Sequence, residues 1–141
     1  MIRVLVVDDH ELVRSGISRM LADNPDIDVI GQVSSGEDAI DFVRRDRPDI
    51  VLMDIRMPGI GGLEATRRIL RIDDSIRVIV VTACADDPYP TRVMQSGAMA
   101  YITKGADIQE MVRAIRMAHS GQRYISPEIA QKMALKQVSG D

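Results

Sequence analysis

The chain has 141 residues, which is enough for one domain with a well-buried core. Hydrophobic residues make up 45% and charged residues 28%, as in ordinary globular proteins, and no apolar run approaches the ~20 residues of a membrane helix. The net charge of -3 excludes the strongly basic composition of a free-standing nucleic-acid binder. The single cysteine, Cys84, excludes an internal disulfide, and with a start unlike a signal peptide it predicts a cytoplasmic location.

Five short runs rich in branched aliphatic residues predict strands. In chain order they are Ile2–Val7, Val29–Ser34, Ile50–Met53, Val78–Val81 and Ala100–Thr103. Three of them consist almost entirely of Val, Ile, Leu and Met, which is typical of strands buried on both faces of a parallel sheet. Because the second run contains Gly31, Gln32 and Ser34, we place it at an edge of the sheet.

The segments between these strands have helical periodicity with start and stop signals. The starts are Ser35 with Asp38, Asp87 with Pro88, and Asp107 with Glu110, and the stops are Gly97 and Gly121. Strands that alternate with helices over this length predict a βα repeat with right-handed crossovers. The expected fold class is therefore α/β, with a doubly wound parallel sheet.

The pattern changes after Gly121. Residues 122–126 are typical of a connector, and Ser126 with Pro127 starts a further helix, whose apolar stripe consists of Ile129, Ala130, Met133 and Ala134. A helix of about ten residues is marginal in water unless its stripe packs on something. We expect residues 1–121 to form the domain and residues 122–141 to form a linker helix and tail outside the sheet.

Polar residues follow four of the predicted strands. Asp8 and Asp9 follow the first strand, Asp54 the third, Thr82 the fourth and Lys104 the fifth. Ligands of an open parallel α/β sheet bind outside the carboxyl ends of its strands. One carboxylate in such a place could merely cap the following helix. Polar residues at the carboxyl ends of four strands, all at one rim of the sheet, instead predict a site for a metal ion and an oxyanion.

The residue types of this rim indicate phosphoryl chemistry. Three neighbouring carboxylates repel one another, and a divalent cation relieves the repulsion. Carboxylate and carbonyl oxygens suit Mg²⁺. Lys104 and Mg²⁺ would neutralise the oxygens of a phosphoryl group, and Thr82 would donate a hydrogen bond to them. Asp54 could then act as the nucleophile that forms an aspartyl phosphate.

These residues carry a family resemblance. Asp8-Asp9, Asp54 with Met57-Pro58-Gly59, Thr82-Ala83 and Lys104 together resemble the receiver domain of CheY-like response regulators. Residues 59–66, 101–106 and 121–126 are similar to the GacA/UvrY-type regulators of the NarL/FixJ group. The resemblance implies a five-stranded, flavodoxin-like sheet of strand order 2-1-3-4-5, and a phosphoacceptor signalling domain rather than an enzyme.

The resemblance also implies roles for single residues. Asp54 is the phosphoacceptor, Lys104 pairs with the phosphoryl oxygens, and Thr82 and Tyr101 form a switch. The metal ligands that it implies for Mg²⁺ are Asp9, Asp54 and the backbone carbonyl of Arg56, with Asp8 acting through a water molecule. An ordinary half-buried strand aromatic is the alternative interpretation of Tyr101.

The partners that the resemblance implies are a sensor histidine kinase or phosphotransfer protein, and a second copy of the chain on phosphorylation. It implies a LuxR-type helix-turn-helix domain beyond Asp141 as the only part that binds DNA, and no membrane contact. Only 20 residues follow Gly121, too few for such a domain with its linker. A stand-alone receiver that binds a partner protein is the alternative function.

Three positions depart from the family pattern. Gly105 stands where receivers often have a proline after the lysine, so we expect a trans peptide bond there. Arg56 could shield the phosphoryl group or lie in solvent. Cys84 is interpreted as a reduced small side chain rather than a redox sensor, because the sequence has no second cysteine.

Two other classes of protein fit the sequence poorly. A phosphatase of the haloacid dehalogenase type needs an Asp-x-Asp pair after one strand, whereas Ile55 and Arg56 follow Asp54. A dinucleotide-binding fold needs G-x-G-x-x-G at the start of its first helix, and residues 59–62 miss that spacing.

Overall fold

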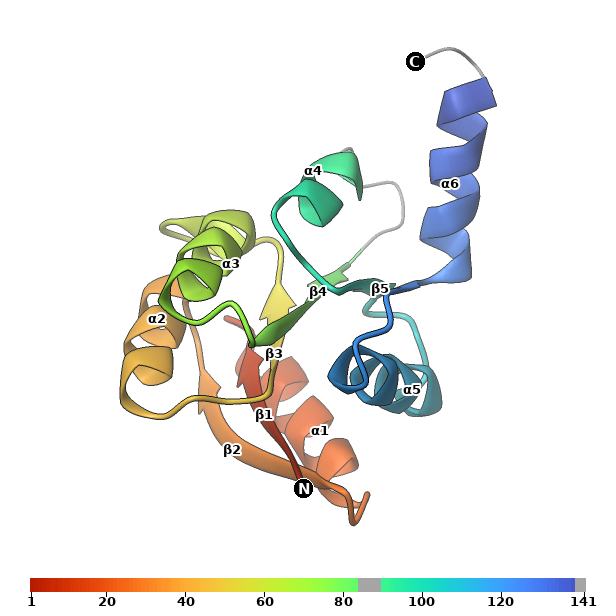
Figure 1. Cartoon of the computed structure of the whole chain (residues 1–141). Helices are drawn as coiled ribbons and strands as arrows, with labels where there is room; N and C mark the ends of the chain where they lie inside the picture. Colours follow the sequence, from red (N-terminus) through yellow and green to blue (C-terminus); the bar gives the residue numbers. More distant parts are fainter. Residues whose placement is uncertain (84–89, 139–141) are drawn as a thin grey trace.

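The structure is a computed structural model that describes residues 1–83 and 90–138 of the chain (Figure 1). The elements within those residues are β1 (Ile2–Val7), α1 (Glu11–Ala22), β2 (Ile27–Val33), α2 (Gly36–Arg45), β3 (Ile50–Asp54), α3 (Gly61–Ile72), β4 (Arg77–Thr82), α4 (Pro90–Gln95), β5 (Ala100–Thr103), α5 (Ile108–His119), β6 (Tyr124–Ile125) and α6 (Pro127–Val138). The predicted helix start at Asp87 and Pro88, and Cys84, lie outside the described residues. No helix in the described part has the length and apolarity needed to cross a membrane.

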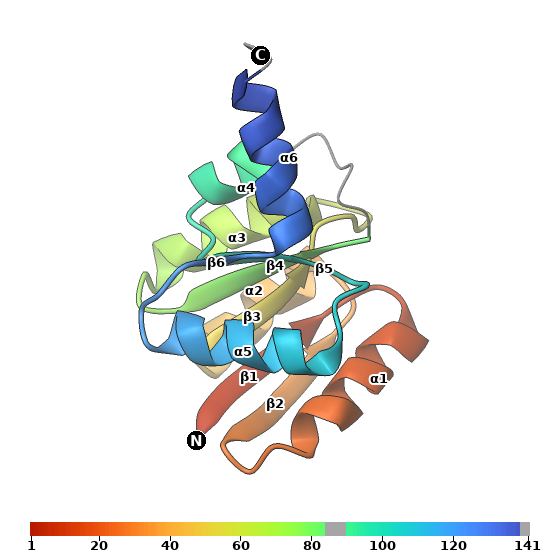
Figure 2. The ribbon, with the colours of Figure 1, turned by 90° about the vertical axis from the view of Figure 1, so that its right-hand side faces the viewer.

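The strands form one parallel sheet with helices on both faces. The order of the described strands is β2-β1-β3-β4-β5-β6, so the predicted doubly wound order 2-1-3-4-5 is confirmed, with β2 at an edge. Helices α1 and α5 cover one face of the sheet, and α2, α3 and α4 cover the other (Figure 2). The predicted number of five strands is wrong, because β6 adds a sixth.

Strand β6 corrects the expectation that everything after Gly121 lies outside the sheet. Tyr124 and Ile125 pair with Ala100 and Tyr101 of β5, and the backbone N–H of Ser126 donates to the carbonyl of Tyr101 at 2.9 Å. Two residues are too few to show the period-2 pattern by which a strand is detected in sequence. The assignment of residues 122–141 to a linker stays a prediction.

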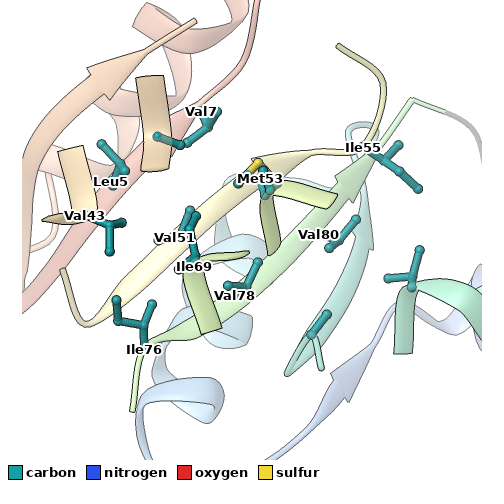
Figure 3. Packing of buried hydrophobic residues seen from close by; sticks show 14 of the residues in the cluster. Leu5, Val7, Val43, Val51, Met53, Ile55, Ile69, Ile76, Val78 and Val80 are labelled. Atoms are coloured by element: carbon teal, nitrogen blue, oxygen red, sulfur yellow. The ribbon is translucent and has the colours of Figure 1, made fainter. Parts of the chain in front are cut away.

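Two apolar layers hold the helices on the sheet. Along β1, Leu5 and Val7 point to one layer, whereas Val4 and Val6 point to the other, because successive strand residues face opposite sides. Figure 3 shows the first layer, in which strand residues meet α2 and α3 through Val43 and Ile69. Burial on both faces explains why the predicted strands are apolar without alternation.

Local capping agrees with two of the predicted helix starts. The Ser35 hydroxyl oxygen accepts a hydrogen bond from the backbone N–H of Asp38 at 3.0 Å, and Asp107 Oδ1 accepts one from Glu110 at 2.8 Å. Helices α4 and α5 are followed by Gly97 and Gly121 with φ of +99° and +87°, the left-handed conformation that commonly ends a helix.

The first turn of α3 lies directly against the end of β3. The backbone N–H of Gly62 donates to the carbonyl of Ile55 at 3.2 Å. A Cβ at Gly62 would overlap the carbonyl oxygen of Asp54 and lie 2.9 Å from the Cα of Ile55. Only glycine lets α3 approach so closely, and this contact fixes the backbone on which the Asp54 side chain stands.

We predict that Gly62→Ala lowers the free energy of unfolding by about 1–3 kcal/mol, because the added methyl group meets rigid backbone. Gly16→Ala is the matched control: a Cβ at Gly16 meets nothing within 4 Å, so alanine within α1 should stabilise by about 0.5–1 kcal/mol. Urea denaturation of both variants measures the difference. Equal effects of the two substitutions would contradict the close approach.

Candidate functional site

The structure brings the predicted polar residues together at the carboxyl rim of the sheet. Asp8 follows β1, Asp54 and Thr82 are the last residues of β3 and β4, and Lys104 follows β5. Parallel strands end on the same side, so these side chains converge although up to 96 positions separate them in the sequence (residues 8 and 104). Asp8, Asp54 and Thr82 are 2%, 3% and 1% exposed.

Lys104 joins two of the buried carboxylates. Its Nζ lies 3.0 Å from Asp8 Oδ2 and 3.2 Å from Asp54 Oδ2. The Lys104 side chain is 19% exposed, so one largely buried cation is shared by two buried acids. Its backbone N–H donates to the carbonyl of Thr82 at 2.6 Å, which places the residue next to the end of β4.

The pKa values of Asp54 and Lys104 are both raised, for different reasons. Burial raises the pKa of the Asp54 carboxyl group, and the negative charge of Asp8 adds to the increase, while Lys104 opposes it without cancelling it. Burial alone would lower the pKa of Lys104, but the hydrogen bond that Lys104 donates to Asp8 and the charge of Asp54 outweigh it and raise that pKa. The ammonium is therefore held in its charged form, whereas the ionised form of Asp54 is disfavoured.

A group of possible metal ligands lies beside this ion pair. Asp8, Asp9, His10 and Asp54 each offer one ligand atom, and these atoms lie within 4.8 Å of one another. Asp9 Oδ1 is buried and accepts no hydrogen bond from the residues that the structure describes, although His10 Nδ1 lies 3.1 Å from it. A buried carboxylate oxygen that accepts no hydrogen bond, among further carboxylates, fits a divalent cation.

His10 was not among the predicted site residues. Its Nδ1 lies 3.1 Å from Asp9 Oδ1 and 3.3 Å from Asp8 Oδ1. The signal available in the sequence was its position directly after the two aspartates, but that position also starts a helix. Only the structure shows that the ring contacts the carboxylates.

Arg56 contributes its backbone at the site. Its N–H donates to Asp54 Oδ1 at 3.3 Å, and its side chain is exposed. The role of its carbonyl as a metal ligand stays a prediction. The peptide bond between Lys104 and Gly105 is trans, as predicted, since the described residues contain no cis peptide bond.

Tyr101 lies deeper than the ordinary interpretation allowed. The residue is 0% exposed and belongs to the same apolar layer as Val93 of α4 and Ile129 of α6. The alternative of a half-buried strand aromatic is therefore wrong. Its predicted part in a switch with Thr82 is not tested by the position of the ring.

Comparison with known proteins gives one consistent family. A model of the response regulator receiver domain matches residues 4–116. The response regulator GacA of Pseudomonas aeruginosa is 62% identical over 96% of this chain and 64% of that protein, and UvrY of Escherichia coli K12 is 55% identical over 98% and 63%. The chain thus spans less than two thirds of the length of these relatives. A crystal structure of a LuxR-family response regulator from Aurantimonas superimposes with a TM-score of 0.91 at 37% identity, covering 96% of this chain and 97% of that one.

We predict that Asp54→Asn stabilises the metal-free protein at neutral pH. A carboxyl group whose pKa is raised by folding costs stability above that pKa, and the cost disappears below the ordinary value of 3.8. Lys104 keeps Asp8 as its partner in the variant. Thermal unfolding without divalent cations should therefore show a higher Tm for Asp54→Asn, with a gap that narrows as the pH is lowered towards 3.8.

Asp74→Asn, at an exposed carboxylate outside the site, is the control and should leave the Tm nearly unchanged. A wild-type protein more stable than Asp54→Asn at neutral pH would show that Lys104 outweighs burial.

Proposed function

The chain belongs to the family of response regulator receiver domains, and we propose that it accepts a phosphoryl group on Asp54 from a sensor histidine kinase or phosphotransfer protein. The observation that carries the proposal is the contact of Lys104 Nζ with both Asp8 and Asp54 at the buried rim of the sheet. A carboxylate held next to a fixed ammonium suits a transfer in which the protein supplies position and charge.

Three side chains of this protein take part in the phosphoryl transfer, those of Asp54, Lys104 and Thr82. A carboxylate oxygen of Asp54 attacks the phosphorus atom and the bond from phosphorus to the donor's histidine nitrogen breaks. An acyl phosphate forms, and the donor ring, protonated beforehand on its other nitrogen, leaves as neutral imidazole. Lys104 stabilises the charge of the phosphoryl oxygens. Thr82, buried at the end of β4, donates its hydroxyl hydrogen to one of them.

Mg²⁺ is the cofactor that we propose for the acidic group. Asp9, Asp54 and the backbone carbonyl of Arg56 would hold the ion, and Asp8 would act through a water molecule. The buried Asp9 Oδ1, which accepts no hydrogen bond from the described residues, supports this assignment. When bound, the ion neutralises the phosphoryl oxygens together with Lys104 and offsets the repulsion among the three carboxylates.

Phosphorylation would reach the rest of the protein through Thr82 and Tyr101. Thr82 lies opposite Thr103 in the register of β4 and β5, two residues along β5 from Tyr101. The carbonyl of Tyr101 accepts the hydrogen bond of Ser126, directly before α6, and the ring shares an apolar layer with Ile129. These contacts support a path from the phosphoryl group to the segment that follows the sheet.

The output that we propose lies outside this chain. The relatives are longer, and the resemblance implies a helix-turn-helix domain after the linker at residues 122–141, which would contact DNA as a dimer formed on phosphorylation. Mg²⁺-dependent self-phosphorylation from small phosphodonors and slow dephosphorylation are the only reactions that we assign to the receiver itself.

We predict that Mg²⁺ with acetyl phosphate adds one phosphoryl group to the chain, measured by intact mass. Asp54→Asn should remain unmodified, whereas the surface control Asp74→Asn should be modified like wild type. Lys104→Ala should slow the modification on the order of 100-fold, because it removes a fixed positive charge from the transferred group. Modification of Asp54→Asn as readily as wild type would refute the assignment.

We predict that phosphorylation changes the conformational exchange of the backbone amides in α4, β5 and α5. Tyr101→Ala should weaken this change while leaving the phosphoryl group on Asp54. The reason is that the side chain of Tyr101, on β5, lies in the same apolar layer as Val93 of α4 and Ile129 of α6. NMR relaxation dispersion with and without phosphodonor measures the effect. Unchanged exchange in these three elements on phosphorylation would contradict the switch.

A further inference from the structure

The ring of His10 faces the acidic group rather than the helix that it precedes. His10 is the N-cap of α1, yet its side chain makes no capping hydrogen bond. Serine, threonine, aspartate or asparagine would cap the helix better. Its backbone N–H donates to Asp8 Oδ1 at 2.9 Å, and its ring Nδ1 forms a hydrogen bond with the same oxygen at 3.3 Å, beside the carboxylates. A residue that departs from the N-cap preference next to a functional site indicates a function at that site.

The distances to the ring match those between neighbouring ligands of one metal ion. Two ligand atoms about 2.0–2.1 Å from an ion lie about 2.9 Å apart in octahedral geometry and about 3.4 Å apart in tetrahedral geometry. His10 Nδ1 is 3.1 Å from Asp9 Oδ1 and 3.3 Å from Asp8 Oδ1. The nitrogen is therefore spaced from Asp9 Oδ1, the proposed direct ligand, much as a neighbouring ligand would be, whereas Asp8 Oδ1 is a hydrogen-bond partner of the ring.

The chemistry of the donor then selects among ions. Mg²⁺ prefers oxygen ligands and keeps its waters, so it gains little from an imidazole. Ni²⁺, Zn²⁺ and Cu²⁺ bind imidazole nitrogen well. The His10 side chain is 66% exposed and can turn without disturbing the core.

We propose that His10 is a metal-selecting residue of this site. Its imidazole Nδ1 becomes a direct ligand when the site holds a divalent cation that prefers nitrogen, and it raises the affinity for such an ion relative to Mg²⁺. The inference rests on the proposed function, because the oxygens involved are those of the phosphoacceptor site. It adds a residue outside the carboxylates and lysine that carry the transfer.

The chain offers a clean test because it contains only two histidines. His119, exposed at the end of α5, is replaced by alanine throughout, so that His10 is the single imidazole. Ni²⁺ and Mg²⁺ are titrated separately by calorimetry into His119→Ala and into the double variant that also carries His10→Ala. In the double variant, Ni²⁺ affinity should fall on the order of tenfold or more, while Mg²⁺ affinity should change several-fold less.

A second measurement detects the ligand directly. Cu²⁺ bound to the His119→Ala protein, labelled with ¹⁵N in histidine, should show hyperfine coupling to one imidazole nitrogen. The coupling should be lost in Asp9→Asn, which removes a neighbouring ligand. Far-UV circular dichroism confirms that each variant is folded.

Three results would overturn the proposal. Equal changes of Ni²⁺ and Mg²⁺ affinity in His10→Ala would show that the ring only shields the carboxylates. An absence of nitrogen coupling would show that it is not a ligand, and Ni²⁺ binding unaffected by Asp9→Asn would place the ion elsewhere. Each result leaves the Mg²⁺-dependent modification of Asp54 as a separate measurement, so failure of this inference is distinguishable from failure of the proposed function.

Discussion

The ion pair that Lys104 makes with Asp8 and Asp54 is the interaction on which the site depends. One ammonium, 3.0 Å and 3.2 Å from two buried carboxylates, keeps two negative charges together where water is scarce. It does not fully compensate for burial, since the pKa of Asp54 stays raised. Several carboxylates facing one ammonium leave the site with an excess of negative charge, which a divalent cation would balance.

The parallel sheet makes this arrangement possible. Strands β1, β3, β4 and β5 all end on one rim, so a single residue at or just after each end is enough to assemble the group. The same residues lower the stability of the fold, because burying polar groups costs free energy. Asp8, Asp54 and Thr82 are all buried at the edge of the apolar layers. Gly62 is part of the same arrangement, because it lets α3 approach the carbonyl of Asp54 at the end of β3.

The rim is connected to the end of the chain through β5. Tyr101 lies in the layer that α4 and α6 also enter, and its carbonyl holds Ser126 at the start of α6. The segment after the sheet therefore contacts the predicted switch residue directly. A rearrangement of β5 would therefore reach the start of α6 through Tyr101 and Ser126.

The sequence by itself determined the five longer strands, their order through the family resemblance, the caps at Ser35 and Asp107, and the residues of the rim. These features depend on local periodicity, on hydrogen bonds within a few residues, or on a specific motif. Only the tertiary structure decided that Tyr124 and Ile125 extend the sheet, that Tyr101 is fully buried, and that His10 turns towards Asp8 and Asp9. These three depend on contacts with residues distant in the chain or on the direction of one side chain, and no local pattern records either.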